Sequence, residues 1–141
     1  MVKNVGVLCI LLFIFTGCSI VSQEAYVVPN SYKENTKTYY VEHLITDKND
    51  LNKLIEKAII KNGFSVVNNH KQADVIVTYI DRWFWDMGNY LILLKIQFRD
   101  SKNKFPMIVG ENARTSFARK EPEFMVDELI KVMFEKQNRR F

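Results

Sequence analysis

Two stretches of the chain repeat apolar residues at the spacing of an amphipathic helix. In the first, apolar residues recur at i, i+3, i+4, i+7 and i+8, at Leu51, Leu54, Ile55, Ala58 and Ile59. Asp47 can cap the start of this helix, and Gly63 is placed to end it. The second helix opens at Pro122, and its apolar side comprises Met125, Val126, Leu129, Val132 and Met133. Each apolar side predicts a helix packed against a sheet.

Five other stretches have the composition or the alternation of strands. They span residues 39–45, 64–67, 73–85, 89–99 and 105–117. The fourth stretch has one wholly apolar face, which we expect to pack on the helices, at Tyr90, Ile92, Leu94, Ile96 and Phe98. The element order is therefore βαββββα. We expect an α+β fold of two layers, with two helices on one face of a mostly antiparallel sheet of four to five strands.

Both tryptophans, Trp83 and Trp85, lie beside the turn between the third and fourth of these strands. A two-residue loop ending at Gly88 places both tryptophans in the core, which buries more apolar area. A three-residue loop with Gly88 left-handed suits the turn residues better. It places the tryptophans on the opposite, open face of the sheet together with Leu91 and Leu93. The sequence leaves both registers open.

In the open-face register, these aromatic and leucine side chains form an exposed apolar patch beside Arg82. The segment from Lys95 to Lys120 adds seven basic residues against two acidic ones, although the whole chain carries only +4. This charge is too small to indicate nucleic acid, but a local basic strip can contact lipid headgroups, glycan phosphates or an acidic protein. The other interpretation of the strip is a solvated face that prevents aggregation of strand edges. The candidate binding surface comprises Trp83, Trp85, Arg82, Leu91, Leu93, Lys95, Arg99 and Arg114.

The sequence contains no recognisable catalytic or metal-binding arrangement. His43 shares a side with apolar residues of the first predicted strand, so we expect it in the core or at its rim, and we expect His70 in a solvated loop. Neither histidine has a partner histidine or cysteine at the spacing of metal ligands. No serine lies in a nucleophile-elbow pattern. We therefore expect a protein without enzymatic activity and without a metal or other cofactor.

The amino-terminal segment has the order of a secretory signal: a lysine, an apolar run and small residues before a cysteine. The run Val5–Phe15 has eleven residues, whereas a membrane-spanning helix needs about 20. Thr16 and Gly17 then precede Cys18. This pattern resembles the lipobox of bacterial lipoproteins, although Phe15 stands where that family usually has an aliphatic residue. The resemblance implies cleavage before Cys18 and attachment of diacylglycerol and acyl groups to it. A plain signal peptide or a short membrane anchor is the alternative.

Lipidation would divide the chain into a signal peptide (residues 1–17), a lipidated start with a flexible tether (18–36) and one α+β domain (37–141). Within the tether, an alternative for Tyr26-Val27-Val28 is a short edge strand docked on the sheet. Removing 17 of 141 residues leaves 124, which suffice for one domain. Cys18 would be the only cysteine left, so no disulfide forms within the chain. Ser19 differs from the aspartate that retains enterobacterial lipoproteins at the inner membrane. The resemblance therefore implies an outer-membrane lipoprotein that faces the periplasm.

A second resemblance concerns the globular part. A helix that ends in Gly63-Phe64, a short strand, and Ala73-Asp74 opening a strand of branched residues resemble small envelope lipoproteins with a βαβββα domain. These include the accessory lipoprotein of lipopolysaccharide assembly and the curli secretion lipoprotein. The resemblance covers about residues 37–136 and implies a fold and the binding of envelope components, but it identifies no functional residue.

We therefore expect a membrane-anchored periplasmic module that binds or assembles with another envelope component, such as an envelope protein. The alternative is a module that binds a glycan or lipid ligand, such as peptidoglycan or lipopolysaccharide. That module would use the Trp83/Trp85 hairpin and the basic strip.

Overall fold

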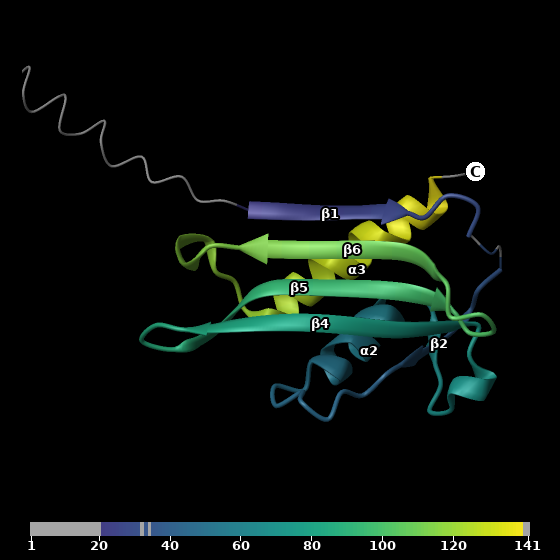
Figure 1. Ribbon diagram of the computed structural model, residues 1–141, viewed down its shortest axis with the longest axis horizontal. Coiled ribbons are helices and arrows are strands. Elements are labelled where there is room, and N and C mark those ends of the chain that lie inside the picture. The colour runs from purple at the N-terminus through teal and green to yellow at the C-terminus, as the bar shows by residue number, and fades with distance from the viewer. Residues whose placement is uncertain (1–20, 32, 34, 140–141) are drawn as a thin grey trace, which may run out of the picture.

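A computed structural model describes residues 21–31, 33 and 35–139 and shows a sheet with two helices packed against it (Figure 1). The strands are β1 (Val21–Val27), β2 (Thr38–Val41), β3 (Ser65–Val66), β4 (Val75–Trp85), β5 (Asn89–Asp100) and β6 (Pro106–Arg114). The helices are α2 (Leu51–Lys61) and α3 (Pro122–Asn138), and the short 3-10 helices η1 and η2 span His70–Gln72 and Ser116–Ala118. The predicted signal peptide and Cys18 lie outside the described residues. No described helix is long and apolar enough to cross a membrane.

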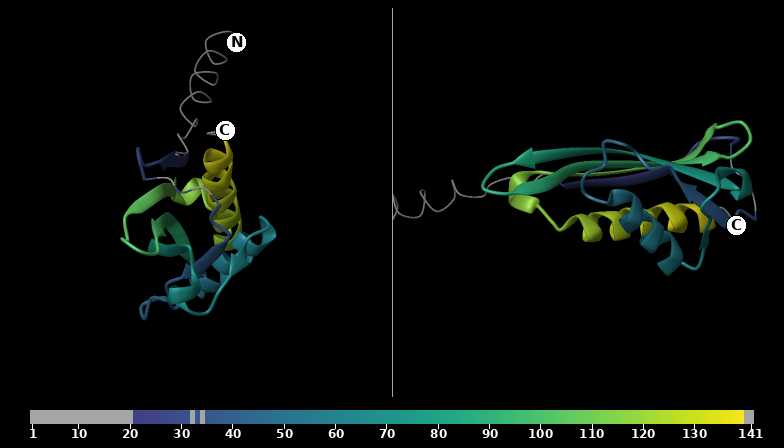
Figure 2. Two further views of the ribbon diagram at one scale, coloured as in Figure 1. Left: turned by 90° about the vertical axis from the view of Figure 1, so that its right-hand side faces the viewer. Right: turned by 90° about the horizontal axis from the view of Figure 1, so that it is seen from below.

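The strands form one mixed sheet in the order β1-β6-β5-β4-β2-β3. Strand β2 runs parallel to β3 and β4, and the other neighbours are antiparallel. Both helices lie on the same face of this sheet (Figure 2). The α+β class and the two helices on one face are confirmed, as is the βαββββα order from residue 37 onwards. The predicted four to five strands of a mostly antiparallel sheet need correction, because the described residues form six strands in a mixed sheet with two parallel pairs.

The additional strand, β1, lies in the segment that was expected to be a flexible tether. It pairs with β6 along its whole length, from Val21 opposite Arg114 to Val27 opposite Ile108. The backbone N–H of Val28 also donates a hydrogen bond to the Met107 carbonyl over 2.8 Å. Residues 21–27 therefore belong to the folded domain, and the expectation of a tether is wrong for them. The alternative of a docked edge strand is correct for Tyr26 and Val27, and the strand begins five residues earlier, at Val21. An edge strand is hard to recognise when most of its residues stay accessible, as they do here.

The start of α2 is tied to the centre of the sheet through Asp47. Its carboxylate accepts hydrogen bonds from the backbone N–H groups of Leu51 (3.2 Å) and Asn52 (3.0 Å), as a cap does. The Tyr79 hydroxyl on β4 donates to the same carboxylate over 2.7 Å. Burial, with the bond to Asp47, raises the pKa of the Tyr79 hydroxyl. The helix ends at Lys61, and Gly63 follows with φ +89°, so the predicted capping aspartate and the predicted left-handed glycine are both confirmed.

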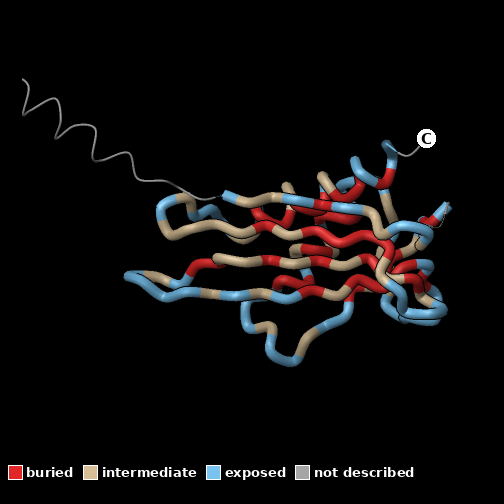
Figure 3. The backbone as a smooth tube through the Cα atoms, turned by 45° about the horizontal axis from the view of Figure 1, so that its top comes forward, coloured by how far each residue is buried: buried red, intermediate tan, exposed pale blue. Residues whose placement is uncertain are grey.

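Helix α3 packs against both the sheet and α2, which explains its wide apolar side. Phe134 stacks on Phe64 with ring centroids 4.2 Å apart, and Ile130 is fully buried. Close approach to the sheet depends on Gly110 in β6, where a Cβ would lie 2.7 Å from the Met133 sulfur and 2.9 Å from a Leu129 methyl. The buried residues of the central strands and of the helix sides that face them form the core (Figure 3).

Four carboxyl groups are held in their charged form. Burial by itself would raise the pKa of Asp47, Asp100 and Glu128. Hydrogen bonds to each carboxylate outweigh burial and lower the pKa, and nearby lysines add to this effect at Asp100 and Glu128. The pKa of Asp74 is lowered chiefly by the backbone N–H of Lys37, which donates over 2.9 Å. Buried Asp100 also forms an ion pair with Lys33 at 2.5 Å. These groups connect the ends of strands and helices to neighbouring segments.

The lowered pKa values predict an acid-sensitive fold. Their stabilising contribution is present above the ordinary values of 3.8 for aspartate and 4.5 for glutamate, and is lost as the pH falls through the lower folded-state values. Urea unfolding at a series of pH values should therefore show a free energy of unfolding that declines below pH 4.5. Asp47→Asn should cost about 1 kcal/mol at neutral pH through the weakened cap and make the acid decline shallower. An unchanged acid slope in this variant would contradict the role assigned to Asp47.

Candidate functional site

The β4–β5 turn has three residues, Asp86 to Gly88, and pairs Phe84 with Tyr90 and Trp85 with Asn89. The three-residue loop, one of the two alternatives left open by the sequence, is therefore the one that forms. The left-handed residue is Met87, at φ 54°, whereas Gly88 does not have a positive φ. The expected role of Gly88 as the left-handed residue is thus wrong.

This loop was expected to place both tryptophans on the open face of the sheet. A β-bulge in β5 prevents this for Trp83. Arg82 pairs with Leu93, but Trp83 pairs with Leu91, so Ile92 is an extra residue on β5. The extra residue moves Trp83 and Leu91 back to the face that the helices cover. Leu91 is fully buried there, and the partly buried Trp83 packs against the core. The Trp83 indole N–H donates to Asp81 over 2.6 Å.

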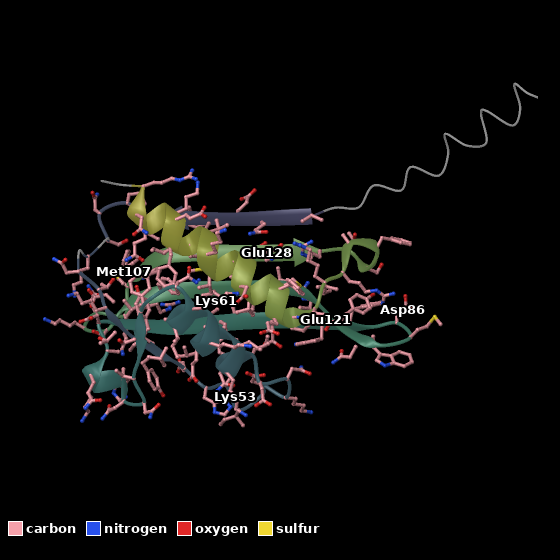
Figure 4. The ribbon with its side chains drawn as sticks, turned by 180° about the vertical axis from the view of Figure 1, so that it is seen from behind. Lys53, Lys61, Asp86, Met107, Glu121 and Glu128 are labelled. Atoms are coloured by element: carbon pink, nitrogen blue, oxygen red, sulfur yellow. The ribbon has the colours of Figure 1, made fainter. Side chains whose placement is uncertain are left out.

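Trp83 and Leu91 therefore do not belong to an open-face binding surface, which corrects that part of the sequence prediction. Trp85 differs from them because it lies beyond the edge of the core, with its side chain 75% exposed. Figure 4 shows the tip of this hairpin, marked by Asp86, projecting from one end of the molecule, whereas Met107 lies towards the other end.

Large exposed apolar side chains gather at that end of the molecule. We call this group the hairpin end, and it comprises Phe84, Trp85, Met87, Phe117 and Phe124. They come from the β4–β5 hairpin, from η2 and from the first turn of α3. The Met87 side chain is 97% exposed. A cluster of this kind is unusual on a soluble surface and indicates a contact site.

A hollow of about 600 Å³ separates the hairpin from the start of α3. Its lining includes Gly88, Asn89, Tyr90, Arg119, Lys120, Glu121, Pro122 and Phe124. The Arg119 guanidinium lies 5.1 Å from the centre of the Tyr90 ring, a cation–π contact that holds η2 against β5. A second hollow of about 460 Å³ shares Asn89, Glu121, Pro122 and Phe124 and is also lined by Trp83. The hairpin end is therefore grooved as well as apolar.

The face of the sheet opposite the helices forms a second candidate surface. We call it the open face, and it comprises Tyr26, Thr78, Ile80, Arg82, Leu93, Lys95, Gln97, Arg99 and Glu111. Ile80 is 60% exposed, and Lys95 forms an ion pair with Glu111 at 3.5 Å. Arg99 donates hydrogen bonds to the Thr78 hydroxyl and to the Gln97 side-chain oxygen. A shallow hollow of about 290 Å³ lies over Ile80, Lys95 and Arg99.

The basic residues of the candidate binding surface are divided between two faces. Arg82, Lys95 and Arg99 lie on the open face with Leu93, whereas the Arg114 side chain points towards α3 and is only 7% exposed. Arg114 donates to Glu128 over 2.7 Å, and Lys120 binds the same carboxylate. The period of two along a strand causes this division, because Asn112 and Arg114 share the face of Gly110, where α3 packs. Arg114 is therefore a structural residue, which corrects its assignment to the binding surface.

The two histidines lie apart. His43 is exposed beyond the end of β2, which is shorter than predicted, so the expectation of a core or rim position is wrong. His70 is exposed in η1, as predicted, with its ring 6.0 Å from that of Tyr40. Within residues 21–31, 33 and 35–139, no group of three histidine, cysteine or acidic side chains is placed to hold a metal ion.

The different burial of the tryptophans predicts different effects on stability. Trp83→Ala should lower the free energy of unfolding by about 2 kcal/mol, because it removes core contacts and the bond to Asp81. Trp85→Ala should change it by less than about 0.5 kcal/mol, because its side chain is exposed. Urea titration of both variants measures the difference. Equal losses of stability would contradict the bulge at Ile92.

Comparisons with known proteins connect the chain to a fold. No family model matches the sequence, and no curated protein matches it. Among solved structures, two dodecamer structures of PelC from Paraburkholderia phytofirmans are similar, with TM-scores of 0.59 and 0.56 at 15% and 13% identity. Both comparisons cover 84% of this chain and 98% of the PelC chain. A PDZ domain protein from Parabacteroides distasonis is similar over 82% of this chain and 35% of its own, with a TM-score of 0.51 at 14% identity. At these identities the similarity shows the fold alone.

Proposed function

We propose that the protein is a non-enzymatic module of the bacterial envelope, anchored to a membrane by lipid on Cys18, that assembles with other protein chains through its open face. The lipobox pattern at Cys18 supports the anchor and the periplasmic side of the outer membrane as its location. The observation that carries the assembly role is the open face itself. The sequence contains no recognisable catalytic arrangement, which supports a binding role over catalysis.

The open face has the composition of a protein-binding surface. Two of its apolar side chains, Ile80 and Tyr26, are more than half exposed, although helices cover the opposite face. They alternate with charged groups, and Ile80 pairs across the sheet with Lys95, which contacts Glu111. Interfaces between separately folded proteins combine apolar and charged side chains in this way. A sheet face with half-exposed branched residues gains stability when a second surface covers them.

The first partner to test is a further copy of the same chain. The two PelC structures that share the fold are described as dodecamers, and their similarity extends over almost the whole PelC chain. This supports self-association, although the fold by itself identifies no partner. A different envelope protein at the same face would enlarge the purified particle in the same way.

Two isoleucines of matched exposure allow a controlled test of the open face. Ile80 on β4 is 60% exposed, and Ile60 on α2 is 58% exposed. Ile80→Glu should weaken assembly by roughly tenfold to a hundredfold, because it replaces an apolar contact with a carboxylate that must lose its water. Ile60→Glu should leave assembly unchanged. Light scattering of the full chain in detergent measures the mass of the particle.

Wild-type protein and Ile60→Glu should give a particle of several chains, and Ile80→Glu should give a smaller one at the same concentration. A wild-type particle that contains a single chain and no second protein would contradict the proposal. Equal masses for the two variants would contradict the open face as the contact.

A second candidate function is favoured by the exposed Trp85 and the adjacent hollow of about 600 Å³. Exposed tryptophans bind sugar rings and acyl chains through their flat apolar faces. A glycan or lipid ligand at the hairpin end is compatible with assembly through the open face, because the two surfaces lie on different parts of the sheet.

A further inference from the structure

The exposed apolar side chains of the hairpin end are found at the end of the sheet where β1 begins. Val21, the first residue of β1, pairs with Arg114 at the end of β6. The neighbouring residue, Ala113, pairs with Leu93 of β5, where the β4–β5 hairpin starts to extend beyond the other strands. The views in Figures 1 and 2 agree on this common end.

The chain length between Cys18 and β1 limits where a lipid on Cys18 can lie. Three residue steps separate Cys18 from Val21, and a fully extended chain covers at most about 3.6 Å per residue. The Cα of Cys18 therefore lies no more than about 11 Å from that of Val21. With β1 paired to β6, the anchor has a short reach and a fixed starting point.

The hairpin extends beyond the end of the sheet by about the same distance as the longest possible separation of Cys18 from Val21. From Arg82, which pairs with Leu93, three more residues of β4 lead to Trp85. At about 3.3 Å per residue, Trp85 lies roughly 10 Å beyond that pair, and Met87 lies further out in the turn. A membrane that holds the lipid of Cys18 therefore comes within reach of both side chains.

We propose that the hairpin end rests in the headgroup region of the same membrane that holds the Cys18 lipid, with Trp85 and Met87 as its principal contacts. This inference rests on the lipid anchor of the proposed function. The hairpin and the anchor together fix the orientation of the domain. The sheet then stands upright on the membrane, and its open face is accessible to neighbouring chains.

The side chains at the tip suit a lipid headgroup region. Tryptophan prefers the boundary between water and hydrocarbon, because its ring is apolar and its N–H is polar. Exposed Phe84 and Met87 add apolar area without a charge to desolvate. Arg82 and Arg119 are matched in number by Asp86 and Glu121 in the same segments, and Lys120 is paired with Glu128, so the contact depends on apolar insertion and little on salt.

Quenching by brominated lipids tests this placement. The chain has two tryptophans, so Trp83→Phe leaves Trp85 as the only tryptophan. The lipidated full chain is reconstituted in vesicles of phosphatidylethanolamine and phosphatidylglycerol with brominated acyl chains. We expect Trp85 emission to shift to shorter wavelength and to lose most of its intensity, at low and at high salt.

The matched control uses the opposite end of the sheet. Phe105 lies in the β5–β6 turn and is 53% exposed, the same fraction as Phe84. The variant Trp83→Phe/Trp85→Phe/Phe105→Trp therefore carries one tryptophan far from the hairpin end. Its emission should stay unquenched in the same vesicles. Equal quenching in the two proteins would overturn the proposed orientation.

A separate variant distinguishes failure of this inference from failure of the anchor. If Cys18→Ser leaves as much protein in the membrane fraction as the wild type, the lipid anchor is wrong. If the wild type is anchored but Trp85 is not quenched, the anchor stands and the membrane contact is overturned. In that case the hairpin end faces water or a protein partner.

Discussion

The pairing of β1 with β6 is the constraint on which the other conclusions depend. Seven residues of β1 are held against the sheet, and Ala25 and Val27 contribute to the core. This pairing shortens the segment between the proposed lipidation site and the folded domain from the expected eighteen-residue tether to three residue steps. A long tether would let the domain search for partners at any angle. With the proposed lipid on Cys18, a short one would hold one end of the sheet at the membrane.

A single residue at the base of the hairpin has a comparable effect on the binding surfaces. The bulge at Ile92 reverses the faces of the hairpin, so that Trp83 and Leu91 join the core while Trp85 extends past it. Trp83 then supports the hairpin from the side of the core, with its N–H bonded to Asp81. The packing of Trp83 against the core therefore fixes the direction in which the exposed tip of the hairpin projects.

The sequence predicts those elements whose apolar residues are numerous and regularly spaced. Helix α2 has its predicted stripe and both predicted ends, because Asp47 and Gly63 act locally. Strand β1 has few buried residues, since it lies at an edge, and so it carries little pattern. The bulge has no local signal either, because Leu91, Ile92 and Leu93 are all apolar and fit either face. The assignment of Arg114 to the binding surface was wrong because its charge does not reveal its ion pair with Glu128 of α3.

In the proposed arrangement the domain has one end at a membrane and one sheet face free for assembly, and the placement at the membrane depends on β1 being part of the sheet. Amide hydrogen exchange of residues 21–27 tests this most directly. The account predicts that the β1 amides directed at β6 exchange slowly, with protection approaching that of β6, because opening them requires separation of two paired strands. Exchange of all β1 amides at the rate of an unstructured peptide would contradict it, since the anchor would then be a free tether.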